Sequence, residues 1–216
     1  SLNLWRPTRE MWGEDYGEAE KSIGSVTGIG FLTTNLTATL ESFRRKKVKI
    51  EGPGPAGRAQ IATVYDPDGN SLFVLEPPKP KVRRTGLLSL QMVTVASRDA
   101  ARAGEFFTKS LGMRGGRSDE EGMRFYRLSA SGTSLMPFTP TKEMYDNAKD
   151  YEEDLAHIGE NTSIIFSTRD IYRLQDALMA RGVRFSQKAE KASWGGLEAE
   201  FLDPDDNRYA LIQGMA

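Results

Sequence analysis

The chain has 216 residues, of which 38% are apolar and 27% are charged, a composition typical of a folded globular protein. Its 29 basic and 30 acidic side chains give a formal net charge of −1, which argues against a polyanion-binding role on nucleic acid or an anionic membrane. No cysteine and one histidine exclude disulfides, thiolate metal sites and multi-histidine centres. The lack of cysteine makes the cytoplasm the expected compartment. No apolar run approaches the roughly 20 residues of a membrane helix, so we expect no membrane partner.

An internal repeat is the strongest signal along the chain. Residues 1–12 align with residues 134–145, with Ser, Leu, Pro, Thr, Glu and Met in register. Further on, the segment Asp66-Pro67-Asp68-Gly69-Asn70 aligns with Asp203-Pro204-Asp205-Asp206-Asn207. Residues 1–77 and 134–213 are therefore interpreted as two copies of one unit.

Each copy predicts the same elements in the same order. A strand (28–33 or 163–168) is followed by a helix, a short strand near 48–50 or 183–185, and two strands around the DPxxN segment. The helix over 170–181 is expected to end at Gly182, where the first copy has Lys47 instead. The DPxxN segments are interpreted as hairpin turns rather than calcium loops, because no ladder of spaced carboxylates accompanies them.

A linker over 78–85, rich in proline and charge, separates the first copy from another stretch of similar design. That stretch predicts a strand over 88–95, a helix over 99–110, and strands over 123–128 and 133–138. The chain is thus expected to contain three βαβββ modules. The expected domains are an incomplete first domain over 1–77, made of one last strand and a whole module, and a complete two-module domain over 86–216. The first domain is completed either by a segment missing at the N-terminus or by another chain, as in a homodimer.

Several short motifs together resemble the vicinal oxygen chelate superfamily. They are Phe106-Phe107 on a helix followed by Leu111-Gly112-Met113, a helix ending in Arg181-Gly182-Val183, and the DPDGN turn. The superfamily includes glyoxalase I, extradiol dioxygenases, and the fosfomycin- and bleomycin-resistance proteins. The resemblance implies an α+β fold in which paired βαβββ modules form curved mixed sheets around a cavity.

The resemblance also implies where a metal would be held. Metal enzymes of the superfamily place His or Gln on the first strand of a module and Glu on the last strand. In residues 86–216 the matching positions fall on Met92, or Gln91 after a shift of one residue, and on Met136, Ser163 and Ala210. In residues 1–77 they fall on Asn3, Gly28 and Phe73. These side chains do not suit a divalent ion, so no metal and no cofactor are predicted, and the nearest relatives are expected among the metal-free, bleomycin-resistance-like members.

Trp194 is the aromatic residue singled out for ligand binding. Its Trp194-Gly195-Gly196 segment resembles the WG segment of bleomycin-resistance-like members, in which an aromatic side chain lines the drug groove. The alternative is that Trp194 only covers the sheet edge. The lone histidine, His157, is interpreted as a loop residue rather than a general base, because no partner for proton transfer can be assigned.

These features predict a protein that binds a small organic molecule without a metal. The predicted ligand-binding residues are Trp194, Met92, Met136, Ser163 and Ala210, and no catalytic residue can be assigned. A metal-dependent lyase, isomerase or dioxygenase of the same superfamily is the alternative. A third interpretation is a degenerate scaffold with a filled cavity and no ligand.

Overall fold

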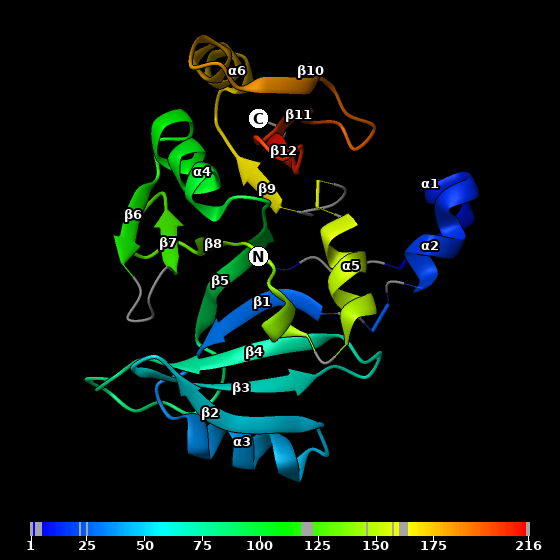
Figure 1. The fold of residues 1–216 in the computed structure, drawn as a ribbon. Helices are drawn as coiled ribbons and strands as arrows, with labels where there is room; N and C mark the ends of the chain where they lie inside the picture. The colour runs from blue at the N-terminus through cyan, green and yellow to red at the C-terminus, as the bar shows by residue number, and fades with distance from the viewer. Residues whose placement is uncertain are drawn as a thin grey trace. The chain divides into compact units, whose positions relative to one another are not determined.

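A computed structural model describes residues 2, 6–21, 23–24, 26–117, 123–145, 147–156, 158–159 and 164–214. They form two compact units, one over residues 1–93 and the other over residues 94–117 and 123–216 (Figure 1). The fold is mixed α+β with curved mixed sheets, as predicted. Among the described residues, no helix is long and apolar enough to span a membrane.

The first unit contains the first βαβββ module. It comprises β1 (Val26–Leu32), α3 (Leu36–Arg45), β2 (Ile50–Ala56), β3 (Ala59–Tyr65) and β4 (Ser71–Glu76), and Figure 1 shows α3 along one face of the sheet. Leu36 and Leu40 of α3 pack there against Ala62, Val64 and Val74 of the sheet. Three short helices that the sequence did not predict precede the module: α1 (Arg9–Trp12), η1 (Gly13–Asp15) and α2 (Tyr16–Lys21).

The predicted linker lies along the first module. The Arg84 N–H donates to Thr34 Oγ1 at 2.8 Å, and the Gly86 N–H donates to Thr39 Oγ1 at 2.9 Å. The chain then enters β5 (Ser89–Ala96), whose first half pairs antiparallel with β1 and brings Met92 opposite Gly30. The strands of the first unit therefore run in the order β2-β3-β4-β1-β5. This pairing joins strands on the two sides of the linker expected at 78–85. The predicted domain boundaries stay a prediction.

The second unit contains the rest of the second module and all of the third. The second module continues from β5 through α4 (Ala100–Glu105), the π-helical turn η2 (Phe106–Ser110), β6 (Arg114–Arg117), β7 (Arg124–Arg127) and β8 (Ser134–Phe138). The connection holds η3 (Lys142–Met144) and α5 (Ala148–Ala156). The third module is β9 (Ile164–Ser167), α6 (Ile171–Ala180), β10 (Arg184–Lys191), β11 (Leu197–Leu202) and β12 (Arg208–Gln213), with strand order β10-β11-β12-β9. The element order thus gives the three predicted βαβββ modules.

Aromatic side chains fill the core of the second unit. Phe201 and Tyr209 stack with ring centroids 5.3 Å apart, and Phe107 meets the Tyr209 ring edge-on at 6.3 Å. Phe166 lies against both Phe201 and Tyr209, at 5.9 and 6.1 Å. Buried ring pairs of this kind stabilise a core by about 0.5–1.5 kcal/mol beyond the area that they bury. The Phe106-Phe107 motif thus supplies one ring to a core that it shares with the third module.

The helix of each module begins with the same two contacts. A side chain just before the helix accepts from backbone N–H groups of the first turn: Asn35 for α3, Asp99 for α4 and Asp170 for α6. The first helical N–H donates to a side chain at or just after the last strand of the same module. These donor and acceptor pairs are Leu36 with Glu76 at 2.7 Å, Ala100 with Thr139 at 3.0 Å, and Ile171 with Gln213 at 2.8 Å.

The two predicted helix ends differ as the sequence indicates. Gly182 follows α6 with φ of 82°, and Lys47 follows α3 with φ of 62°. A left-handed backbone costs a residue with a side chain about 1 kcal/mol relative to glycine. Lys47 therefore lowers the stability of the first module at a position where the third module has glycine.

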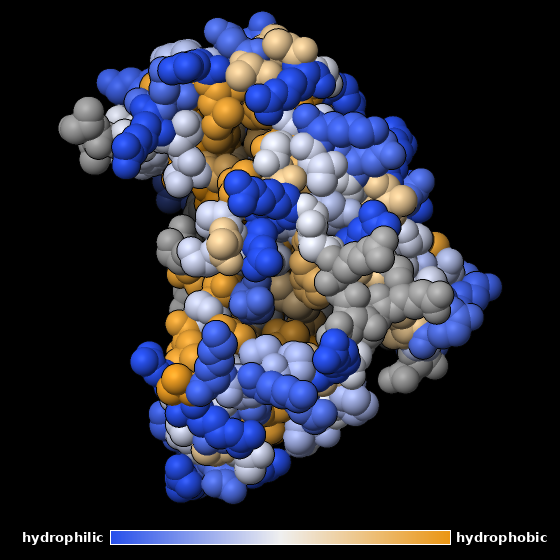
Figure 2. Space-filling model, turned by 90° about the vertical axis from the view of Figure 1, so that its left-hand side faces the viewer, coloured by the Kyte–Doolittle hydropathy of each residue, from blue (hydrophilic) through white to orange (hydrophobic). Residues whose placement is uncertain are grey.

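Polar and charged side chains cover most of the surface seen in Figure 2, and apolar residues show between them in separate patches. Apolar side chains that are more than 40% exposed occur in both units. In the second unit they are Leu128, Met144, Ile165, Tyr172, Met179 and Trp194.

Gly104 of α4 provides the first testable prediction. A Cβ at this position would overlap the hydroxyl of Tyr126, whose side chain is buried. Gly104→Ala should therefore lower the free energy of unfolding by about 1–3 kcal/mol, although alanine is the better helix former. Urea denaturation measures the loss. Gly17→Ala in α2 is the matched control, because nothing lies within 4 Å of its added Cβ. A Gly104→Ala variant as stable as the parent would contradict this packing.

Candidate functional site

A buried turn organises the third module. Asp203, between β11 and β12, accepts from the backbone N–H groups of Asp205 and Asn207 through Oδ1, at 2.8 and 3.0 Å. Its Oδ2 accepts from Asn207 Nδ2 at 2.9 Å and from the Tyr209 hydroxyl at 3.0 Å. Both carboxylate oxygens are thus fully used by protein donors, which fixes the start of β12.

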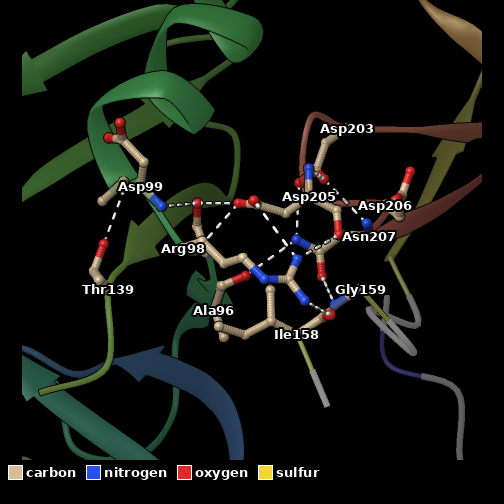
Figure 3. A network of polar contacts seen from close by, with 12 residues as sticks. Ala96, Arg98, Asp99, Thr139, Ile158, Gly159, Asp203, Asp205, Asp206 and Asn207 are labelled. Atoms are coloured by element: carbon tan, nitrogen blue, oxygen red, sulfur yellow. Dashed lines mark hydrogen bonds and ion pairs between the residues drawn. The ribbon is translucent and has the colours of Figure 1, made fainter. Parts of the chain in front are cut away.

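The same turn is tied to the segment that joins β5 to α4 (Figure 3). Asp205 Oδ2 accepts from the Ser97 hydroxyl and from the Arg98 N–H, and Asn207 Nδ2 donates to Ala96 O at 3.0 Å. The Arg98 guanidinium donates to Asp205 O at 3.3 Å and to Ile158 O at 3.1 Å. The network therefore holds the third module against the end of β5.

The turn in the first unit repeats the inner part of this arrangement. Asp66 Oδ1 accepts from the N–H groups of Asp68 and Asn70, and Asn70 Nδ2 donates to Asp66 Oδ2 at 2.8 Å. Asn70 Oδ1 accepts from the Gly24 N–H at 2.9 Å, as Asn207 Oδ1 does from Gly159 at 3.1 Å. The DPxxN segments are hairpin turns, as predicted, because their first carboxylates bind backbone and side-chain donors within the turn.

Burial makes Asp203 an unusual carboxyl group. Desolvation is the largest influence and raises the pKa of Asp203, while the hydrogen bonds from Asn207, Asp205 and Tyr209 act in the opposite direction. Burial and the neighbouring Asp203 charge raise the pKa of Tyr209 well above its usual value, so this hydroxyl stays a donor. The pair is a structural contact, because Asp203 is 1% exposed and Tyr209 is completely buried.

The sheet of the third module has one covered face and one open face. Ala199 and Phe201 of β11, with Tyr209 and Leu211 of β12, form the covered face, and all four are buried. Strand alternation places their neighbours on the opposite face. The register across β11, β12 and β9 joins Glu200 to Ala210 and Ala210 to Ile165. We call this surface the open face, formed by Ile165, Glu198, Glu200, Ala210 and Ile212.

Trp194 lies at one end of the open face. Its indole Nε1 donates to Glu198 Oε2 at 3.2 Å, and its side chain is 44% exposed. The ring lies over Gly196, where any Cβ would overlap it and would approach Gln213 O to 2.6 Å. The missing side chain of Gly196 therefore makes room for the indole, which keeps one surface in solvent beside a carboxylate.

The other predicted site residues are distributed between the units. Met92 lies in the first unit, where it is 5% exposed and close to Gly30, whose added Cβ would come within 2.8 Å of both Met92 Cγ and Leu75 Cδ1. Met136 is buried on β8 and Ala210 is half-buried on β12, both in the second unit. Ser163 and His157 lie outside the described residues, as does Asn3. Of the predicted site residues that the structure describes, Ala210 and Trp194 alone are brought onto one surface.

Two glycines were not assigned a specific role from the sequence. Gly30 gives Met92 its place beside β1, and Gly196 gives the Trp194 ring its place beside β12. Gly196 is a sequence neighbour of Trp194, whereas nothing local to Gly30 indicates that a side chain 62 residues away packs there. The hydrogen bond between Trp194 and Glu198 was not predicted from the sequence.

The donor set at the expected ligand positions does not fit a divalent ion. Met92, Met136 and Ala210 carry no imidazole or carboxylate, and Gln91 offers one neutral amide. Among the described residues, no group of three or more His, Cys, Asp or Glu side chains is placed to hold a metal. Glu198 and Glu200 lie on the open face but bind Trp194 and, at 3.4 Å, Arg208. The residues at these positions therefore do not support metal-dependent chemistry.

Comparisons with known proteins agree with this fold. The family model described as the Glyoxalase/Bleomycin resistance protein/Dioxygenase superfamily matches residues 89–211. A probable lactoylglutathione lyase, chloroplastic, of Arabidopsis thaliana is 26% identical over 211 residues, which cover 93% of this chain but 57% of that protein. The chain thus spans little more than half the length of that curated relative.

Two solved structures illustrate the likeness of fold. Glyoxalase I from Zea mays superposes with a TM-score of 0.59 at 18% identity, over 86% of this chain and 66% of that one. A member of the glyoxalase/bleomycin resistance protein/dioxygenase superfamily from Sphaerobacter thermophilus gives 0.51 at 23% identity, over 59% of this chain and 98% of that one.

The buried turn leads to a prediction about pH. Tyr209→Phe keeps the stacked ring but removes the donor to Asp203, so we expect a loss of about 1 kcal/mol in the free energy of unfolding at pH 7. The pKa of Asp203 is higher in the folded protein than in the unfolded chain. The free energy of unfolding therefore falls as the pH rises from the ordinary carboxyl pKa through the raised one. Losing the Tyr209 bond raises this pKa further, so the loss should shrink in acid, where Asp203 is protonated.

Urea denaturation at pH 7 and in mild acid tests this expectation. Tyr172→Phe on the exposed side of α6 is the matched control and should change stability little at either pH. An equal loss for Tyr209→Phe at both pH values would assign the effect to ring packing instead of the bond to ionised Asp203.

Proposed function

Because the chain belongs to the glyoxalase/bleomycin resistance protein/dioxygenase superfamily, we propose that it binds a small organic molecule without a metal ion. The binding surface in this proposal is the open face of the third module, with Trp194 as one wall and Ala210 on its floor. Ser163 stays in the proposal as a further ligand-binding residue, whereas Met92, in the first unit, and Met136, buried on β8, are not part of this surface.

The observation that carries the proposal is the way in which Trp194 is held. An indole that only covered an edge would be expected to bury its ring, whereas this one is 44% exposed. Gly196 beneath it and Glu198 beside it fix its position without covering it. A fixed aromatic surface that remains in solvent can stack on a ligand without first losing side-chain freedom.

The chemistry around Trp194 favours a flat ligand that carries a positive charge. The electron-rich face of an indole attracts a cation, and Glu198 adds a negative charge within hydrogen-bonding distance of the same ring. Glu200 lies on the same face of β11, two residues along. A cationic aromatic compound would therefore find both a stacking surface and compensating charge.

A second candidate is lactoylglutathione lyase activity. It is favoured by the 26% identity to the Arabidopsis protein over nearly all of this chain. The residues at the positions of the family's metal ligands argue against it, because methionine and alanine replace coordinating side chains. The predicted cytoplasmic location and the expectation of no nucleic-acid partner belong to the proposal as well, and they rest on the lack of cysteine and the balanced charge.

The first test is the substitution Trp194→Ala. It should weaken binding of a cationic aromatic compound by about 1–3 kcal/mol, as expected for an aromatic anchor, with a nearly unchanged melting temperature. Isothermal titration calorimetry with a panel of aromatic drugs provides the measurement, because it does not need the fluorescence of Trp194. Tyr172→Ala is the matched control, because Tyr172 is a similarly exposed aromatic residue on α6.

Glu198→Gln separates charge from stacking in the same titration. It keeps an acceptor for the indole N–H but removes the negative charge, so it should weaken cationic ligands more than neutral ligands of the same shape. Failure of the whole panel to bind, or a Trp194→Ala variant that loses stability but not affinity, would support the edge-covering role of Trp194.

A second test concerns metal dependence. Dialysis against a strong chelator should change the affinity for the aromatic ligand by less than about twofold. Lactoylglutathione lyase activity should stay at background when Mg²⁺, Mn²⁺, Ni²⁺ or Zn²⁺ is added back. Activity that is lost with chelator and restored by one of these ions would replace the binding proposal with the enzymatic one.

A further inference from the structure

The connecting segment between the first module and β5, residues 77–88, concentrates positive charge. It contains no acidic residue, and its four basic residues are Lys79, Lys81, Arg83 and Arg84. All four are exposed, and among the described residues Arg83 alone has an acidic partner, Glu76 at 3.7 Å. The chain as a whole has a formal net charge of −1, but screening limits the influence of distant charges to about 8 Å at physiological ionic strength. A partner at the connecting segment therefore meets a basic surface.

The connecting segment also concentrates exposed aliphatic side chains. Val82 is 60% exposed, the largest fraction of any large apolar residue described, and Leu87 and Leu88 are 42% and 40% exposed. In the rest of the described chain, exposed large apolar residues are at least seven positions apart. Single exposed apolar residues are ordinary on a protein surface, whereas a concentration of them marks an interaction site.

The main chain of the connecting segment is fixed on the first module. Three alternate N–H groups of the segment donate to acceptors of the module. The pairs are Arg84 with Thr34 Oγ1 at 2.8 Å, Gly86 with Thr39 Oγ1 at 2.9 Å, and Leu88 with Leu32 O at 2.8 Å. Thr39 is completely buried, so one of these anchors belongs to the core of the module. The segment thus presents its side chains on a backbone that needs no further ordering when a partner binds.

We propose that residues 77–88 form a docking surface for an acidic segment of another protein that also carries aliphatic side chains. Carboxylates of the partner lie against Lys79, Lys81 and Arg84, and its aliphatic side chains cover the exposed valine and leucines. Complementary charge speeds encounter and excludes basic partners, while apolar contact adds the burial that charge alone does not provide. The surface belongs to the first module, so the inference does not depend on the ligand proposed for the open face of the third module.

The anchored backbone favours a protein partner over an anionic membrane. Elements that lie in a membrane interface bury their apolar side chains about 5–10 Å deep in the lipid. The hydrogen bonds of Arg84, Gly86 and Leu88 keep this part of the segment along the module instead of letting it project. The near-neutral chain also provides no long-range attraction to an anionic lipid surface. An acidic peptide can lie along the segment without either requirement.

Three fluorescein-labelled peptides, each with 12 residues of two alternating types, are suitable probes of this surface. The Glu–Leu peptide has both negative charge and aliphatic side chains, the Glu–Ser peptide has the charge alone, and the Lys–Leu peptide has the opposite charge. Fluorescence anisotropy should show that the parent protein binds the Glu–Leu peptide at least about tenfold more tightly than the Glu–Ser peptide. The Lys–Leu peptide should not bind measurably.

Two variants separate charge from apolar contact. Lys81→Glu/Arg84→Glu should weaken binding of both Glu-containing peptides by about tenfold or more, because it turns attraction into repulsion. Leu87→Ser should weaken binding of the Glu–Leu peptide about fivefold and leave the Glu–Ser peptide unchanged. The melting temperature should change little in both variants, because the substituted side chains are exposed and the main-chain anchors remain.

Arg45→Glu/Lys46→Glu is the matched control, since it makes the same change of charge at exposed positions at the end of α3 in the same unit. It should bind all three peptides as the parent does. An equal loss of affinity in this control, or a parent that does not bind the Glu–Leu peptide, would overturn the proposal. Binding of the parent to phosphatidylserine vesicles but not to the peptide would assign the segment to a membrane instead. Self-association of the parent that Lys81→Glu/Arg84→Glu abolishes would assign it to a second copy of the chain.

Discussion

The backbone edge of the first strand in each module governs how the modules combine. A βαβββ module covers one face of its sheet with its own helix and pairs its first strand on one side with its last. The other side of that strand is left with unpaired N–H and C=O groups, which are costly to bury without partners. In the first unit, β5 supplies those partners to β1. The end of the segment that connects the first module to β5 is held on that module by hydrogen bonds to Thr34 and Thr39.

Within the second unit, a buried carboxylate network fixes the turn between β11 and β12 and ties it to the end of β5. Asp203 closes the hairpin turn, and Asp205 carries that turn onto Ser97 and Arg98 at the end of β5. These bonds set where β12 begins, and thereby which side chains of β12 reach the covered face and which reach the open face. The aromatic core around Tyr209 and the position of Ala210 both follow from this one turn.

Local patterns predicted the elements of the first and third modules but not the short helices α1, η1 and α2, and they did not predict contacts between residues distant in the sequence. The helices that precede Lys47 and Gly182, and the hairpins at Asp66 and Asp203, are encoded by residues that lie within a few positions of one another, so their prediction from the sequence was right. The pairing of β1 with β5 depends on Gly30 accommodating Met92, a contact that no nearby residue signals. For the candidate site, the sequence identified Trp194 and its glycines. The exposure of the Trp194 ring and its hydrogen bond to Glu198 depend on the register of the hairpin, which cannot be read from the sequence alone.

The bonds between the start of each helix and the end of the same module have an evolutionary consequence. Glu76, Thr139 and Gln213 close their modules from tail to head, although they are three different residue types. A segment closed in this way satisfies its own most exposed helix donors wherever it is copied in a gene. A duplicated module therefore carries with it an acceptor for its first helical N–H, and later divergence can alter the sheet surface while any side chain that accepts a hydrogen bond preserves this closure.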